Sequence, residues 1–167
     1  MSSVNDLRTL KAELVADVKR LKKLYHKYEL VHQKLSQITP DEFDYVALAY
    51  TIVNLYGLIE NYFLRISKIF ENNLDPVSWH KHLLERMSLE IEDLRPAFMT
   101  DQDYIFFDEL RAFRHIFRYI YQQELDIDKL LQLDTSIPKG IERFYELHQS
   151  YLGKLETLIE RIEALEG

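Results

Sequence analysis

The sequence has no cysteine, and it has only four glycines and four prolines among its 167 residues. Without cysteine there is no disulfide and no thiolate metal site, and a reducing compartment is the natural setting. The scarcity of glycine and proline favours helices with few turns. No apolar run approaches the ~20 residues that a membrane span needs, and the charged N-terminus does not resemble a secretory signal. These absences predict a soluble cytoplasmic protein.

Hydrophobic residues make up 47% of the chain and aromatic residues 13%, which argues against disorder. The length suits one domain with one core. We therefore expect an all-α fold, an up-and-down bundle of about five helices, in a single domain over 1–167. The net charge is -7, but residues 1–36 carry eight Lys/Arg against four Asp/Glu. This uneven, largely acidic surface argues against broad coating by nucleic acid and leaves room for a small local RNA site.

Helical periodicity and capping patterns predict the elements. An a/d heptad pattern with one polar interruption, Asp17, marks a first helix over 4–36. Thr39 followed by Pro40 and Glu42 predicts the start of a second helix that ends near Asn73. The remaining expected helices cover 75–90, 101–125 and 138–165, opened by Asp75-Pro76, by Thr100 with Asp103, and by Pro138. Residues 126–138 are expected to form a polar connector with at most one helical turn near Leu130.

The second helix is apolar around most of its circumference, so it is expected at the centre of the bundle or at a dimer interface. Gly57 lowers helix propensity by roughly 1 kcal/mol, and close approach of another helix is the expected reason. Asn54, Glu60 and Asn61 interrupt the apolar surface. They face the arginine-bearing helix described below and orient it, or they lie on a narrow exposed stripe; the sequence leaves both open.

Two other groups of polar residues favour the simpler interpretation. The lysines and arginine around the first heptad pattern suit an RNA or partner contact, but a solvated helix face is the commoner cause of such a pattern. His80 and His82 are two apart on a helix and point about 200° away from each other, so they do not bind one metal ion together. The sequence also has no glycine-rich phosphate loop and no Ser-His-Asp or Cys-His arrangement. We expect no metal and no cofactor.

A basic segment stands out in this acidic chain. Between residues 110 and 121 it places three arginines and one histidine within eight residues: Arg111, Arg114, His115 and Arg118. On a helix, these side chains form a cationic face opposite an apolar arc of roughly 120°. Arginine binds phosphate in bidentate geometry, so this face suits a phosphate-bearing partner. The alternative is that the arginines pair with nearby carboxylates as ordinary helix-surface ion pairs.

The run from Asp108 to Tyr121, followed by Glu124-Leu125-Asp126, resembles the signature of HepT-like proteins of the HEPN superfamily. Tyr50 to Phe70 with Glu60-Asn61 inside it, and the Trp79-His80 and Leu83 to Met87 steps, also resemble that family. The family motif is an arginine, a polar residue, three residues, a histidine, one residue and a tyrosine. Arg114, His115 and Tyr121 match it, but Tyr119 occupies the position of the histidine.

The resemblance implies an all-α, homodimeric, metal-independent ribonuclease toxin, with tRNA as the expected substrate. It implies a dimer cleft that pools Arg114 from both chains, with His115 and Tyr119 as further catalytic candidates and Arg111 and Arg118 as phosphate-binding candidates. It also implies a nucleotidyltransferase antitoxin that adds AMP to a tyrosine of the toxin. The matching acceptor is Tyr121.

The departure from the motif bears on catalysis. A ribonuclease without metal needs a base for the 2′-hydroxyl proton, an acid for the leaving oxygen and cations for the phosphorane charge. Imidazole suits the first two tasks near pH 7, whereas a phenol with a pKa near 10 is a poor base. His115 lies one helical turn before Tyr119, about 6 Å away along the helix. Three explanations stay open: a ribonuclease of weak or altered activity, a non-catalytic protein that binds its nucleotidyltransferase partner or a nucleotide, and a ribonuclease whose histidine was replaced deliberately. A further interpretation is a helical interaction module built on the heptad pattern.

Overall fold

The computed structural model describes residues 2–71, 77–120 and 124–166, and within these ranges it contains five α-helices and no strand. The helices are α1 (Val4–Ser36), α2 (Glu42–Phe70), α3 (Trp79–Met87), α4 (Asp101–Arg118) and α5 (Ile127–Glu166). The chain is thus an all-α bundle, as predicted. Among the described helices, none combines the length and apolarity that crossing a membrane requires.

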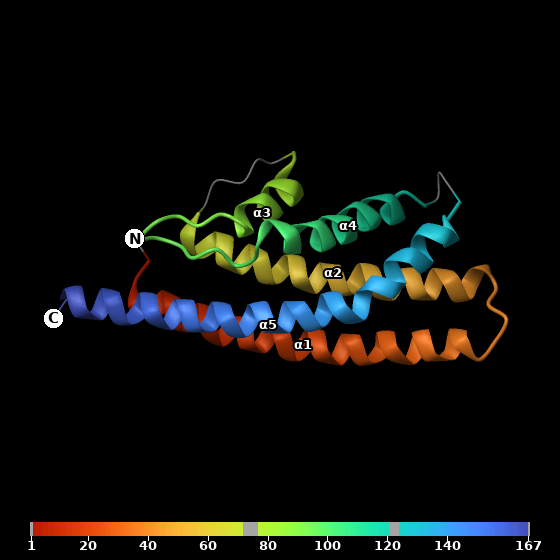
Figure 1. Ribbon diagram of the computed structural model, residues 1–167, viewed down its shortest axis with the longest axis horizontal. Coiled ribbons are helices and arrows are strands. Elements are labelled where there is room, and N and C mark those ends of the chain that lie inside the picture. Colours follow the sequence, from red (N-terminus) through yellow and green to blue (C-terminus); the bar gives the residue numbers. More distant parts are fainter. Residues whose placement is uncertain (1, 72–76, 121–123, 167) are drawn as a thin grey trace.

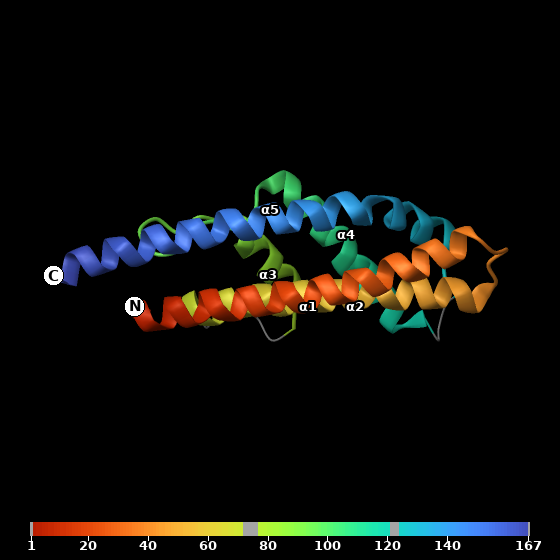
Figure 2. The ribbon, with the colours of Figure 1, turned by 90° about the horizontal axis from the view of Figure 1, so that it is seen from below.

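The three long helices form the body of the bundle. α1 and α2 make an antiparallel hairpin, and α5 runs along both, so that α1 begins and α5 ends at the same end of the molecule (Figure 1). α3 and α4 pack against α2, and α4 also contacts α5. Figure 2 shows α5 on one side of the bundle and the α1–α2 hairpin on the other. α2 therefore contacts each of the other four helices, which agrees with its predicted central place.

α1 spans the range that the heptad pattern predicted. Its N-terminus carries a capping box, in which the Ser3 hydroxyl accepts from the Asp6 N–H and the Asp6 carboxylate accepts from the Ser3 N–H. The heptad residues turn inward into the common core, and the fully buried ones are Leu7, Leu10, Leu14, Leu21 and Tyr28. Because helices of the same chain cover this pattern, it does not offer the free surface that a separate interaction module needs.

Asp17, the polar interruption of the heptad pattern, is buried but paired. Its carboxylate accepts hydrogen bonds from Arg20 at 2.7 Å and from Arg65 of α2 at 2.6 Å. A buried carboxylate is tolerated when cations and hydrogen bonds satisfy it. Asp17 therefore links α1 to α2 through Arg65.

The predicted ends of α2 were wrong by a few residues. Asp41, not Thr39, is the N-cap, because Asp41 and Asp44 form a reciprocal capping box with two hydrogen bonds of 3.0 Å. Carboxylates also interact favourably with the positive end of the helix dipole. At the other end, α2 stops at Phe70, and the side chain of Glu71 pairs with Arg86 and with the buried Arg95.

The close approach of a helix that was expected at Gly57 occurs at Gly140 instead. Nothing among the described residues lies within 4 Å of the place where a Cβ on Gly57 would stand, so no close approach of a helix explains this glycine. Gly140 of α5 is the position of close approach. The ring of Phe106 from α4 lies 2.0 Å from the site of its missing Cβ. Glycine at 140 thus lets α4 pack down on α5.

The cap of α4 was predicted correctly, and its end was not. Thr100 and Asp103 form the expected capping box. The helix ends at Arg118 rather than near residue 125. At this end the Tyr119 N–H donates to the Ile116 carbonyl at 3.1 Å. α3 likewise ends at Met87 rather than near Glu90, and its predicted start at 75–76 lies outside the described residues.

The predicted connector 126–138 is helical. α5 begins at Ile127 and continues through Pro138, since Leu130, Leu133, Ile137 and Ile141 lie buried at helical spacing. A proline inside a helix leaves the carbonyl four residues earlier without its N–H donor. That carbonyl belongs to Asp134, and the buried Tyr28 hydroxyl donates to it at 3.3 Å and also to the Asp134 carboxylate. A side chain from α1 thus replaces part of the lost helix bonding.

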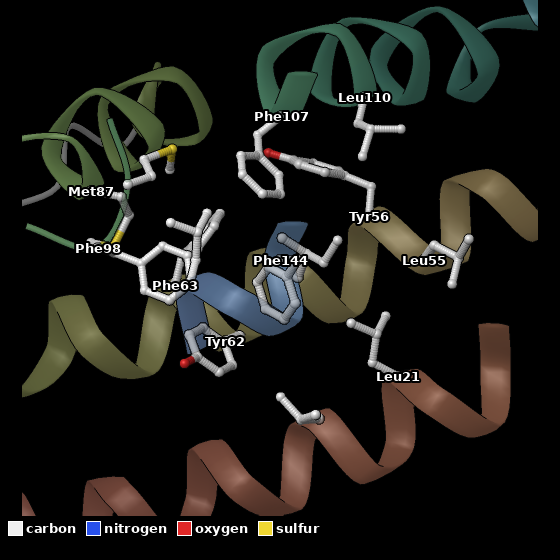
Figure 3. Close-up of a cluster of buried hydrophobic side chains, with 14 of the residues drawn as sticks. Leu21, Leu55, Tyr56, Tyr62, Phe63, Met87, Phe98, Phe107, Leu110 and Phe144 are labelled. Atoms are coloured by element: carbon white, nitrogen blue, oxygen red, sulfur yellow. The ribbon is translucent and has the colours of Figure 1, made fainter. Parts of the chain in front are cut away.

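The centre of the core is aromatic. Phe63 of α2 meets Phe98, Phe107 and Phe144 edge to face, with ring centroids 5.2 to 6.2 Å apart. Figure 3 shows these rings between α2, α4 and α5, with the Tyr56 ring under α4 beside Phe107 and Leu110. This cluster fixes the position of α4 over α2, and so the position of the basic segment.

Candidate functional site

The basic segment does not face solvent in the way its helical wheel predicted. α4 packs inward through Phe107 and Leu110, both about 1% exposed, whereas Ile116 of the predicted apolar arc is 48% exposed. The apolar arc is therefore buried at Leu110 and exposed at Ile116. Packing through Phe107 turns part of the cationic face toward α2 and leaves an apolar strip of α4 uncovered.

Arg114 is held by a buried carboxylate. Its guanidinium donates to Oε1 of Glu60, a residue of α2 that is only 4% exposed. The guanidinium also lies over the Tyr56 ring, with 6.0 Å between its central carbon and the ring centroid. Burial and the Glu60 carboxylate hold the pKa of Tyr56 far above its ordinary value. Of the two interpretations of the polar residues on the second helix, orientation of the arginine helix is correct for Glu60, whereas Asn61 is exposed.

His80 binds the second oxygen of the same carboxylate. Its Nδ1 lies 2.6 Å from Oε2 of Glu60, and its ring stacks on Trp79 with centroids 3.6 Å apart and planes 26° apart. Glu60 therefore joins α2 to α3 and to α4 at once. A carboxylate removed from water needs such partners, since an unpaired buried charge is strongly destabilising.

These side chains border a pocket of about 280 Å³ between α2, α3 and α4. Four cationic side chains and one carboxylate are among the residues that line it: Tyr56, Glu60, Val77, Ser78, His80, Lys81, Arg111, Arg114, His115 and Arg118. The pocket thus collects four of the predicted site residues from α4. Its net positive charge suits an anionic ligand such as a phosphate.

The remaining predicted residues fall differently. Arg111 pairs with Asp108 at 2.7 Å, so the simpler ion-pair interpretation holds for this arginine, although it still borders the pocket. Tyr119 follows the last turn of α4, is 48% exposed, and is not among the described residues lining the pocket. Its ring contacts that of His115, with centroids 5.2 Å apart. Tyr121 lies outside the described residues.

Sequence reasoning missed the roles of His80, Lys81 and Tyr56. His80 was considered as a metal ligand together with His82 and as part of the Trp79-His80 step, but not as a partner of Glu60. Among the described residues no group of three or more His, Cys, Asp or Glu side chains is placed to hold a metal ion. The signal that could have found its role is Glu60. A carboxylate on an otherwise apolar helix requires cationic or hydrogen-bonding partners, and the nearest candidates in the bundle are on the two helices that cover it.

Comparison with known proteins identifies one family. The model of one protein family, described as HepT-like protein, matches residues 47–155. No curated protein and no solved structure matches the sequence. The matched range includes α3, α4 and most of α2, and with them every residue that lines the cationic pocket.

Proposed function

The chain belongs to the HepT-like protein family, and we propose that it is the toxin of a toxin–antitoxin pair and cleaves RNA without a metal ion. The observation that supports this proposal is the cationic pocket in which buried Glu60 holds Arg114 in place. In this proposal Arg114 binds the scissile phosphate, and Arg111 and Arg118 bind neighbouring phosphates. Fixed guanidinium groups also stabilise the negative charge that grows on the phosphorane in the transition state.

We further propose that the chain forms a single domain and acts as a homodimer. The α1 helix precedes the matched range, yet its leucines belong to the same hydrophobic core as α2 and α5. An uncovered apolar strip of α4, with Ile105 58% exposed and Ile116 48% exposed, borders a groove of about 560 Å³ between α4 and α5. A second copy covering this strip removes apolar surface from water.

We propose two partners by analogy with the family. A nucleotidyltransferase antitoxin attaches AMP to Tyr121, and the substrate is RNA of the tRNA class. An anionic adduct on a residue three positions after Arg118 adds negative charge to a cation-rich stretch of the sequence, and in this proposal it competes with the phosphates of RNA.

A second candidate function is binding without cleavage. The observation that favours it is Tyr119, which stands in the position of the motif histidine and is not among the described residues lining the pocket. In this case the dimer holds a nucleotide or its nucleotidyltransferase partner in the same cationic pocket.

One experiment separates the two candidates. The chain as it stands, Arg114→Ala, Tyr119→His and Tyr119→His/Arg114→Ala are each induced in cells and, after purification, incubated with tRNA. We expect the chain as it stands to arrest growth and to cleave tRNA. Arg114→Ala should lower the cleavage rate at least ~100-fold. The same preparations should sediment as dimers. Cleavage by none of the four proteins contradicts the ribonuclease proposal and leaves the binding function.

A further inference from the structure

Two imidazoles are among the described residues that line the cationic pocket, and of these His80 is held by a carboxylate from the described part of the chain. His80 of α3 binds Glu60, whereas His115 of α4 is exposed and has the Tyr119 ring beside it. We propose that His80 is a catalytic residue, the general base that takes the proton from the RNA 2′-hydroxyl. This proposal rests on the ribonuclease function proposed above.

The contact with Glu60 determines which nitrogen of His80 can act. The Nδ1–H donates to Glu60 Oε2 at 2.6 Å, so in the neutral imidazole Nε2 carries the lone pair. A carboxylate behind an imidazole also stabilises the imidazolium that forms when Nε2 accepts a proton. The Glu60–His80 pair therefore has the composition of a general base with its orienting group.

The plane of the ring is fixed as well. Trp79 stacks on His80 with 3.6 Å between centroids, and the His80 side chain remains 34% exposed at the pocket. A catalytic base needs both an accessible nitrogen and a restricted orientation, because small displacements cost large factors in rate. Stacking restricts the ring without burying it.

Glu60 also sets the distance between the base and the phosphate-binding group. Arg114 and His80 bind the two oxygens of one carboxylate. Arg114 uses one of its guanidinium nitrogens for Glu60, and a guanidinium has five N–H donors in all, so it can contact a phosphate at the same time. A phosphate on Arg114 then lies within reach of an imidazole that shares the same anchor.

The step balances without any additional reagent. Nε2 of His80 takes the proton as the 2′-oxygen attacks phosphorus, the new 2′-O–P bond forms, and the bond from phosphorus to the 5′-oxygen breaks. The leaving 5′-oxygen takes a proton from water, and His80 returns its proton to water. The products are a 2′,3′-cyclic phosphate and a 5′-hydroxyl.

Titratable and charged groups from three helices line the pocket together with His80. They are Tyr56 and Glu60 on α2, Lys81 on α3, and Arg111, Arg114, His115 and Arg118 on α4. The test substitutes the imidazole and leaves these groups in place. In His80→Asn the amide N–H replaces Nδ1 as the donor to Glu60 and nothing replaces Nε2. His80→Gln places an amide near Nε2 and serves as a second variant.

The matched control is His32→Asn. His32 also places Nδ1 2.8 Å from a buried carboxylate, that of Asp134, but it belongs to α1 and does not line the cationic pocket. Single-turnover cleavage of tRNA, RNA affinity, thermal unfolding and the pH dependence of the rate are measured for the parent and for each variant.

We expect His80→Asn and His80→Gln to lower the cleavage rate at least ~100-fold, with RNA affinity changed less than about threefold and the limb of the pH–rate profile due to the base lost. His32→Asn retains the parental rate and profile. Cleavage by His80→Asn within about threefold of the parent overturns the proposal. If the parent does not cleave RNA but the Tyr119→His variant does, the proposal for His80 is also overturned. The proposed ribonuclease function of the fold then still stands. If neither cleaves, the proposed function itself fails, and the role of His80 fails with it.

Discussion

Two buried carboxylates in this molecule each bind Nδ1 of a histidine, and they lie in different surroundings. Glu60 joins α2 to His80 at 2.6 Å and to Arg114, beside a pocket lined with cations. Asp134 of α5 binds His32 at 2.8 Å and the Tyr28 hydroxyl, beside the rings of Tyr25 and Tyr28, which stack 5.5 Å apart. The local chemistry of carboxylate and imidazole is nearly the same in both.

The difference lies in what else each carboxylate holds. Glu60 fixes an arginine and an imidazole that remain partly exposed, 23% and 34% of their side chains, toward a pocket. Asp134 fixes Tyr28, which is fully buried and whose hydroxyl also reaches the carbonyl left without a donor by Pro138. A buried carboxylate–imidazole pair is therefore not a functional site by itself. The Glu60–His80 pair is suited to chemistry because accessible cations lie beside it in the pocket. The Asp134–His32 pair instead supports the packing of the bundle.

The largest expected effect separates the two carboxylates by activity. Glu60→Gln removes the charge that holds Arg114 and His80, and we expect RNA cleavage to fall at least ~100-fold through misplacement of both groups. We also expect the free energy of unfolding to fall by on the order of 2 kcal/mol. The reason is that Arg114 and His80 lose their charged partner and solvent replaces it only in part. Asp134→Asn, the matched change, should leave cleavage within about twofold. Equal losses of activity in the two variants would show that the surroundings of the two carboxylates do not determine which one supports cleavage.

The prediction from sequence succeeded where the determinants are local. The capping box of Thr100 and Asp103 and the heptad pattern of α1 involve residues three or four apart, and both are present. The course of α5 through Pro138 was not predictable in this way. There the burial of leucines against other helices outweighs the loss of one hydrogen bond, which Tyr28 of α1 partly replaces.

The same distinction applies to the candidate site. The charge pattern of the sequence identified Arg111, Arg114, His115 and Arg118, and all four border one pocket. It left open whether Glu60 anchors Arg114 or is exposed, because the two residues are 54 positions apart and the contact depends on how α4 packs. The predicted apolar arc is buried at Leu110 and exposed at Ile116, and Phe107, which lies outside that arc, meets the core. Tertiary packing determines that choice.

A smaller effect tests the supporting role of the second carboxylate. Tyr28→Phe removes a fully buried hydroxyl that donates to the Asp134 carboxylate and, at 3.3 Å, to its backbone carbonyl. We expect the free energy of unfolding to fall by about 1–3 kcal/mol, because two buried acceptors lose a donor. Urea unfolding measures the change, with Tyr25→Phe as the control at the neighbouring, less buried ring. A stability equal to that of the parent would mean that α5 tolerates Pro138 without help from α1.

The smallest effect concerns a third histidine, which has no carboxylate partner among the described residues. His148 of α5 is 3% exposed, its Nδ1 lies 2.8 Å from the Tyr62 hydroxyl, and burial followed by the charge of Lys22 lowers its pKa below the ordinary 6.5. Well above pH 6.5 both the folded and the unfolded chain hold this imidazole neutral. As the pH falls below 6.5, the unfolded chain takes up the proton first, so the stability that His148 contributes is lost toward acid pH. The slope cannot exceed about 1.4 kcal/mol per pH unit, the limit for one proton. Urea unfolding between pH 7 and pH 5 should therefore show a steeper loss for the parent than for His148→Gln, which has no titrating group at this position. Parallel curves would mean that His148 is protonated equally in both states, and that an imidazole in this core needs no carboxylate to carry charge.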